Sequence, residues 1–325
     1  MARRILITGG SGFIGTNLVE ACATAGHDVV SMDVLPPRNP AHRPYWRAVD
    51  LLDADGLADA VRSFSPEQIY HLAARTDLHG TTEQDYAANI AGVENLIAAA
   101  GRLANLECVA FASSRLVCRI GYQPASDEDY CPTTPYGRSK MRGELLVRQQ
   151  AANRFHWFIV RPTSIWGPWF DIPYKPFFTA VARGRYLHPD GRRIEKSFGH
   201  VGNSIFQLQR LLAAPAQQTR GRTFYLADHE PIDLLEMAVA IQDAAGARPV
   251  RNVPYALLKG AAYLGDAMKR MGYKEPPITT FRLDNLVTNM VYDLKPVQEI
   301  VGALPFSMRE GVGRTVAWMR SAGQL

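Results

Sequence analysis

The chain has 325 residues, of which 47% are hydrophobic and 21% charged, a composition that is ordinary for a globular protein with one large domain or two closely associated ones. The net charge of +5 is small and dispersed, and no aromatic-plus-basic pattern accompanies it, so nucleic acid is not an expected partner. We find no signal-peptide pattern and no uninterrupted apolar run of 18 residues, which predicts a cytoplasmic protein without a membrane partner. The four cysteines lack C-x-x-C spacing, so we expect buried free thiols and no metal site.

The first patterned stretch runs from Ile5 to Gly15 and reads I-L-I-T-G-G-S-G-F-I-G. A short apolar run predicts a strand, glycines at three-residue spacing predict a tight turn, and a helical pattern follows. Gly9 permits the turn, Gly12 allows the backbone to approach a pyrophosphate, and Gly15 allows helix and strand to pack closely. The N-terminus of the helix then faces the phosphate charge, so the stretch predicts a dinucleotide site.

A second apolar run, Val29 to Met32, ends in Asp33, which lies 18 residues after Gly15. An acidic residue at the end of the second strand can accept both adenosine ribose hydroxyls and would repel a 2′-phosphate. The sequence therefore predicts NAD, not NADP, as the cofactor.

Strands and helices alternate through the first half of the chain, which predicts an α/β fold with a doubly wound parallel sheet of the Rossmann type. The further expected elements are strands at 46–49, 68–72, 108–112 and 158–160 and helices at 53–64, 83–103 and 133–152. The alternation breaks after residue 165. We therefore expect an NAD-binding domain over residues 1–165 and a smaller, interleaved α/β region over 166–325, mainly for substrate, with some segments returning to the first domain. An amphipathic helix at 254–272 is expected to dock on the protein, not on a membrane.

Tyr136 and Lys140 are four residues apart at the start of a predicted helix, which places them on one face. An ammonium beside a phenol favours the phenolate and lowers its pKa, so this tyrosine could exchange a proton near neutral pH. Strands of a parallel sheet deliver their carboxyl ends to the ligand crevice. Ser114, at the end of the fifth strand, can therefore hydrogen-bond the same substrate oxygen, and the adjacent Ser113 is the alternative.

Together these stretches resemble the extended short-chain dehydrogenases/reductases, in particular the NAD-dependent epimerase/dehydratase group. The matching motifs are T-G-G-S-G-F-I-G (Thr8–Gly15), Asp33, Asp50-Leu51, Y-H-L-A-A (Tyr70–Ala74), A-N-I-A-G-V-E-N-L with Asn89, F-A-S-S (Phe111–Ser114), Y-G-R-S-K (Tyr136–Lys140) and R-P-T-S-I-W-G-P (Arg161–Pro168). The resemblance implies a catalytic triad of Ser114, Tyr136 and Lys140. It also implies that the NAD site includes Gly9, Gly12, Phe13, Ile14, Gly15, Asp33, Asp50, Leu51, Leu72, Ala73, Ala74, Asn89, Tyr136, Lys140 and Pro162.

The departures from the family bear on the substrate. Arg115-Leu116 stands where dehydratases of the family carry an Asp-Glu pair, which disfavours dehydration. Ser164 replaces the asparagine of the usual nucleotide-sugar loop, which weakens that substrate class without removing it. The candidate substrate residues are Ser164, Arg282 for a diphosphate, and His200, for which a structural role in the core is equally expected.

The leading hypothesis from the sequence is an NAD-dependent epimerase that oxidises and re-reduces a hydroxyl of a nucleotide-sugar. The alternative is an NAD-dependent alcohol dehydrogenase resembling the 3β-hydroxysteroid dehydrogenase branch. A third reading, a dinucleotide-binding protein without catalysis, is disfavoured by the intact Ser-Tyr-Lys set. The resemblance also implies a homodimer, in which the helices predicted at 83–103 and 136–152 pair with their twofold mates.

Overall fold

The computed structural model describes residues 2–172, 174–273 and 278–325, and the chain forms two compact units. The first unit comprises the residues up to Ile165 together with Gly199–His229 and Asp293–Pro305. The second comprises Trp166–Phe198, Glu230–Tyr292 and Phe306–Leu325. Each unit is thus assembled from segments that are separated in the sequence.

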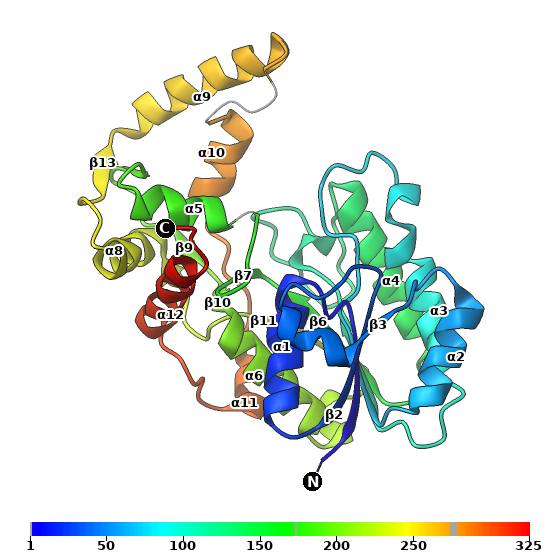
Figure 1. Cartoon of the computed structure of the whole chain (residues 1–325). Coiled ribbons are helices and arrows are strands. Elements are labelled where there is room, and N and C mark those ends of the chain that lie inside the picture. The colour runs from blue at the N-terminus through cyan, green and yellow to red at the C-terminus, as the bar shows by residue number, and fades with distance from the viewer. Residues whose placement is uncertain (1, 173, 274–277) are drawn as a thin grey trace. The chain divides into compact units, whose positions relative to one another are not determined.

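A seven-stranded parallel sheet forms the centre of the first unit, in the order β11-β6-β5-β4-β1-β2-β3 (Figure 1). Its strands are β1 (Arg4–Thr8), β2 (Asp28–Asp33), β3 (Trp46–Ala48), β4 (Gln68–His71), β5 (Cys108–Ala112), β6 (Trp157–Pro162) and β11 (Thr223–Leu226). The chain runs outward from β1 through β2 to β3, then returns to the other side of β1 at β4. Ligands of open α/β sheets bind at such a reversal, beyond the carboxyl ends of the strands. The predicted fold class is confirmed.

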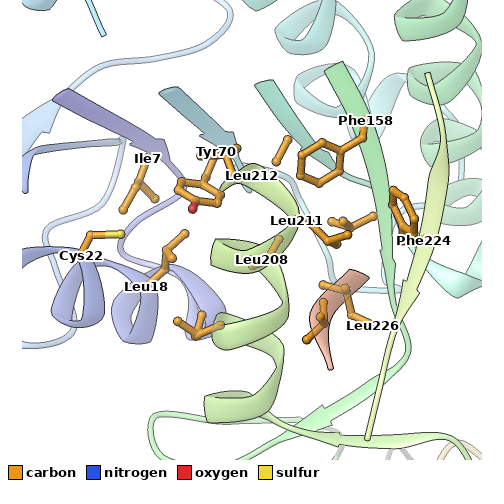
Figure 2. Close-up of a cluster of buried hydrophobic side chains, with 14 of the residues drawn as sticks. Ile7, Leu18, Cys22, Tyr70, Phe158, Leu208, Leu211, Leu212, Phe224 and Leu226 are labelled. Atoms are coloured by element: carbon orange, nitrogen blue, oxygen red, sulfur yellow. The ribbon is translucent and has the colours of Figure 1, made fainter. Parts of the chain in front are cut away.

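Helices cover both faces of this sheet, because alternate strand residues are apolar on both sides. One face packs on α1 (Phe13–Thr24), α6 (Val201–Ala213) and α11 (Lys295–Val301) through a core cluster that includes Ile7, Leu18 and Tyr70 (Figure 2). The other face packs on α2 (Ala54–Phe64), α3 (Ala91–Ala100) and α4 (Pro135–Gln150) through a second cluster that includes Leu6 and Ile69. The remaining elements that lie wholly in this unit are η1 (Pro40–Tyr45), η2 (Gln84–Asn89), η3 (Arg115–Val117) and α7 (Ala216–Thr219).

The single helix expected over 83–103 is wrong: the segment is a 3-10 helix, η2, followed by α3. The break follows from side-chain hydrogen bonds to the loop after β4. Tyr86, whose backbone is non-helical (φ −114°, ψ 32°), donates from its hydroxyl to the Asp77 carbonyl oxygen at 2.8 Å. Asn89 bonds the backbone N–H and carbonyl of Arg75. Helical periodicity in the sequence does not reveal such hydrogen bonds to another segment of the chain.

The second unit is a mixed α/β body. Helices α5 (Tyr174–Ala182), α8 (Leu234–Ala245) and α12 (Met308–Ser321) pack together. Two short strand pairs accompany them: β8 (Leu187–Pro189) with β13 (Arg251–Val253), and β9 (Glu195–Lys196) with β12 (Ile232–Asp233). Short strands β7 (Ser164–Trp166) and β10 (Phe198–His200) occur where the chain passes from one unit to the other.

The helix predicted at 254–272 is present as α9 (Tyr255–Arg270), and it packs on α10 (Thr280–Val287). The expected docking involves only one stripe of α9, where Leu258 and Ala262 are buried with Leu283 of α10. On the neighbouring stripe Leu257 and Leu264 are 67% and 69% exposed. Within the described residues, no helix has the length and apolar character needed to cross a membrane.

Candidate active site

The glycine turn after β1 has the backbone geometry that its residues predicted. Gly9 has a φ of +76°, and a Cβ there would lie 2.5 Å from the Ala73 backbone nitrogen. A Cβ on Gly15 would lie 2.1 Å from the Gly9 carbonyl oxygen. Any larger residue would therefore force the turn away from β4 or from α1. Gly12 precedes α1 and supplies no capping side chain, so no cap competes with an anion at the start of that helix.

Asp33 lies at the carboxyl end of β2, beside this turn. Its Oδ2 accepts a hydrogen bond from the Ser11 N–H at 3.1 Å, and its Oδ1 accepts one from the Leu35 N–H at 3.0 Å. Arg38 donates to the Ser11 carbonyl oxygen at 3.1 Å. The carboxylate is thus held at the edge of the turn, with the half-buried position that a ribose-binding residue requires.

The other residues expected at the cofactor differ in burial and in the contacts of their side chains. Leu72, Ala73 and Ala74 follow β4 and are partly buried, and the Ala73 backbone touches Gly9. Asp50 is exposed, whereas the Leu51 side chain packs in the core against Gly92. Phe13 and Ile14 begin α1, Pro162 ends β6, and Asn89 forms hydrogen bonds with Arg75 and Ser139.

Ser114, Tyr136 and Lys140 come together at the carboxyl end of β5. Thr134 caps α4 by accepting from the Gly137 N–H at 3.0 Å, which places Tyr136 and Lys140 in the first turns of that helix. The Ser114 side chain hydrogen-bonds Tyr136, and the Lys140 Nζ donates to the Ala112 carbonyl oxygen at 2.8 Å. All three side chains are buried.

Ser113 has a different environment from Ser114. Together with His71 and Lys140 it lines a small cavity of about 20 Å³. Its Oγ has no hydrogen-bond partner within the described part of the chain. The geometry therefore joins Ser114, and not Ser113, to the tyrosine.

The protonation of the tyrosine differs from the sequence-based expectation that Lys140 lowers its pKa. Burial raises the pKa of Tyr136 to about 12, and the hydrogen bond from Ser114 and the charge of Arg115 oppose this rise only in part. Burial also lowers the pKa of Lys140 to about 8, against the raising effect of Glu144. Desolvation is the larger influence on both groups. Tyr136 is thus protonated at neutral pH and poised to donate a proton.

A buried ion pair next to the triad was not anticipated. Arg161 donates to Glu144 from Nε at 2.9 Å and from Nη2 at 2.7 Å, and both side chains are almost completely buried. Tyr130 donates to the same carboxylate at 2.9 Å, and Arg161 also donates to the Asp127 carbonyl oxygen. Together these hydrogen bonds connect α4 and the loop before it to β6. The only signal in the sequence was the position of Glu144, one helical turn beyond Lys140.

Two of the three candidate substrate residues, Ser164 and His200, belong to the first unit. Ser164 and His200 are buried, and the His200 N–H donates to the Asp228 Oδ1 at 3.1 Å. Arg282 belongs to the second unit and is exposed on α10. Among the described residues, no group of three or more His, Cys, Asp or Glu side chains could hold a metal ion.

A nucleotide-binding turn, an acidic residue at the end of β2 and a Ser-Tyr-Lys cluster define an NAD-linked enzyme site. The family described as "NAD dependent epimerase/dehydratase family" matches residues 5–186, and the chain belongs to this family. Its cofactor is accordingly NAD.

Individual proteins that are similar to this chain include two sequence relatives and one solved structure. A 3 beta-hydroxysteroid dehydrogenase/Delta 5-->4-isomerase of Mycobacterium tuberculosis is 31% identical over 75% of this chain and 70% of that protein. A 2-alkyl-3-oxoalkanoate reductase of Stenotrophomonas maltophilia is 25% identical over 97% of this chain and 98% of that protein. The structure of UDP-glucose 4-epimerase with UDP-glucose from Thermotoga maritima is 18% identical, has a TM-score of 0.75, and covers 98% of this chain and 99% of that chain. At that identity the structural similarity shows the fold alone.

Proposed function

We propose that the protein is an NAD-dependent dehydrogenase or reductase that interconverts a secondary alcohol and a ketone on an apolar molecule. The observation that carries the proposal is the 31% identity to a hydroxysteroid dehydrogenase over three quarters of the chain. A second relative, the oxoalkanoate reductase, also carries out chemistry on an oxygen-bearing carbon of a molecule with an apolar part. Ser164, in place of the asparagine of nucleotide-sugar loops, agrees with this class of substrate.

The residues present fit NAD. Gly9 and Gly15 leave no room for a side chain at the turn, so the backbone can approach a pyrophosphate beside the start of α1. The Asp33 carboxylate is fixed where it can accept the adenosine ribose hydroxyls. When bound, NAD supplies the acceptor or donor of a hydride.

Ser114 and Tyr136 would bind the substrate oxygen from one side, since their side chains are already hydrogen-bonded to each other. In the reducing direction, the protonated Tyr136 gives its phenolic proton to the ketone oxygen as the carbon gains a hydride, which balances the addition of two hydrogens. In the oxidising direction, the same phenol oxygen receives the hydroxyl proton. The Lys140 ammonium supports the phenolate that forms while the proton is away. Burial keeps Tyr136 protonated without ligand, which is the form that the reducing direction requires.

A nucleotide-sugar epimerase is the second candidate, and membership of the epimerase/dehydratase family favours it. The two candidates share every step up to the ketone. They differ in the fate of the reduced cofactor, which an epimerase uses again in place and a dehydrogenase releases.

The experiment that separates them compares an apolar secondary alcohol, such as a 3β-hydroxysteroid, with UDP-glucose in the presence of NAD. We expect NADH to accumulate with the apolar alcohol in proportion to the ketone formed, and Tyr136→Phe to serve as the inactive control. Interconversion of UDP-glucose with its 4-epimer, without NADH accumulation and without turnover of any apolar alcohol, would contradict the proposal.

A further inference from the structure

Arg115 directly follows the serine that contacts Tyr136, and its side chain is unusual for a buried cation. The residue is 9% exposed, and its Nη1 is buried without a hydrogen-bond partner. Within the described chain, no carboxylate lies within ion-pair distance of its guanidinium. Arg161, the other buried arginine of this unit, is paired with Glu144 through two hydrogen bonds. Two buried arginines of the same unit thus differ, because Arg161 has a carboxylate partner and Arg115 has none within the described chain.

A charged nitrogen that is buried without a hydrogen-bond partner destabilises a fold. Such an arrangement persists where a ligand supplies the missing charge, as in binding sites that are organised before the ligand arrives. The five donors of arginine form a rigid planar fork, which matches the two oxygens of a carboxylate. The unpartnered Nη1 thus indicates an anionic ligand, and the planar fork of the guanidinium indicates that this ligand is a carboxylate.

The position of Arg115 specifies which molecule would carry this anion. Its charge acts on the phenol of Tyr136, where it opposes the rise in pKa caused by burial, so the two groups are close. The pyrophosphate of NAD would lie at the glycine turn after β1. Arg115 follows β5, which is separated from β1 by β4 in the sheet, so the two sites are about 10 Å apart at the usual strand spacing. The anion therefore belongs to the substrate and lies near its reacting carbon.

We propose that Arg115 binds a substrate carboxylate attached close to the reacting carbon, so that the substrate is a 3-hydroxy acid or 3-oxo acid with an apolar remainder. This inference rests on the proposed dehydrogenase or reductase function and narrows its substrate class. The sequence showed Arg115 only as a departure from the Asp-Glu pair of dehydratases. The burial of Arg115 indicates that the residue replaces the Asp-Glu pair with a binding function for the substrate.

The kinetic test uses 3-hydroxydecanoate and its methyl ester, which have the same chain and differ in the negative charge. We expect the wild type to prefer the acid in kcat/KM. Arg115→Met should lower the acid-to-ester ratio by roughly 30-fold to 5000-fold, the range found when one partner of a buried charge pair is truncated. Arg115→Lys keeps the charge without the fork and should recover part of the ratio. Arg119→Met is the matched control, since Arg119 is exposed four residues away, and it should leave the ratio unchanged.

A binding measurement makes the test independent of turnover. Calorimetry with decanoate should show binding to the wild type and a loss of at least about 30-fold in affinity for Arg115→Met. Binding of decyl phosphate in place of decanoate, with the same dependence on Arg115, would overturn the carboxylate assignment. If Arg115→Met reduced acid and ester turnover equally and only shifted the pH profile, Arg115 would act on Tyr136 and the proposal would be wrong.

The experiments distinguish a failure of the proposed function from a failure of the carboxylate assignment. If decanoate binds through Arg115 but no alcohol or ketone is turned over with NAD or NADH, the proposed function is wrong and the anion site stands. If the ester and simple secondary alcohols are oxidised and the acid is not preferred, the proposed function stands and the carboxylate assignment is wrong.

Discussion

The sheet of the first unit and the α9–α10 pair of the second differ sharply in how they bury apolar residues. The sheet has a continuous core on each face, with residues such as Leu6 and Leu18 fully buried. Among the described residues, the α9–α10 pair has a buried apolar cluster of three residues, Leu258, Ala262 and Leu283, while the adjacent stripe of α9 is exposed. The glycine turn and the Ser-Tyr-Lys cluster, which depend on exact positions, lie at the ends of the densely packed strands. The lightly packed α9–α10 pair carries neither of these motifs.

The largest expected effect tests the chemistry at the densely packed edge. Tyr136→Phe removes one hydroxyl while the ring remains in its packed position, so proton transfer is lost and the fold is kept. We expect turnover to fall by about two to four powers of ten. Unchanged urea denaturation and unchanged NAD affinity are the controls. Turnover near the wild-type level would show that the proton follows another route.

The buried ion pair gives the largest expected effect on stability. Arg161→Met leaves Glu144 buried without its counter-charge, which should cost about 3–5 kcal/mol of unfolding free energy. The matched variant is Arg193→Met in the second unit, which breaks the exposed Arg193–Glu195 pair (2.8 Å) and should cost less than about 1 kcal/mol. Equal losses in chemical denaturation would remove the distinction between the two kinds of pair.

A pair of leucine truncations compares the two regions directly. Leu18→Ala leaves a cavity under the sheet and should destabilise the protein by about 2–5 kcal/mol. Leu264→Ala changes an exposed position on α9 and should alter stability by no more than about 0.5 kcal/mol. A large loss for Leu264→Ala in the purified protein would mean that this stripe is covered in solution.

A pH-dependent effect is expected at Asp228, whose Oδ1 accepts from Asn203 at 2.7 Å and whose Oδ2 is buried without a partner within the described chain. Burial raises the pKa of Asp228 to about 6, above that of an unfolded aspartate. The protonated folded state is therefore favoured below about pH 4, and this stabilisation is lost as the pH rises through 6. Asp228→Asn should raise the unfolding free energy at about pH 7.5 by up to about 3 kcal/mol and give no gain near pH 4. A gain of equal size at both pH values would show that ionisation of Asp228 is not the cause.

Much of the first unit could be predicted because its signals are local. The glycine turn needs Gly9 at positive φ, the strands are short apolar runs, and Tyr136 and Lys140 share a helix face by spacing alone. What could not be predicted depends on contacts between distant residues. The break in the helix expected over 83–103 comes from Tyr86 and Asn89 bonding to the loop after β4.

The electrostatics of the site were not predictable for the same reason. The spacing of Lys140 and Tyr136 suggested a lowered phenol pKa, but burial, which no spacing reveals, has the larger effect. Likewise, Arg115 follows one sequence motif and Arg161 begins another, and neither motif indicates whether the guanidinium has a partner. Only the structure shows that one is paired with a carboxylate and that the other has an unpartnered nitrogen next to the tyrosine.

The most direct test of the central claim follows the hydrogen on the reacting carbon. The protein is incubated with NAD and an apolar secondary alcohol that carries deuterium on its carbinol carbon, and the products are separated and analysed by mass spectrometry. We expect deuterium in released NADH, in an amount equal to the ketone formed, with Tyr136→Phe giving neither product. Deuterium that stays in an inverted alcohol, with no labelled NADH released, would contradict the account and assign the protein to epimerisation.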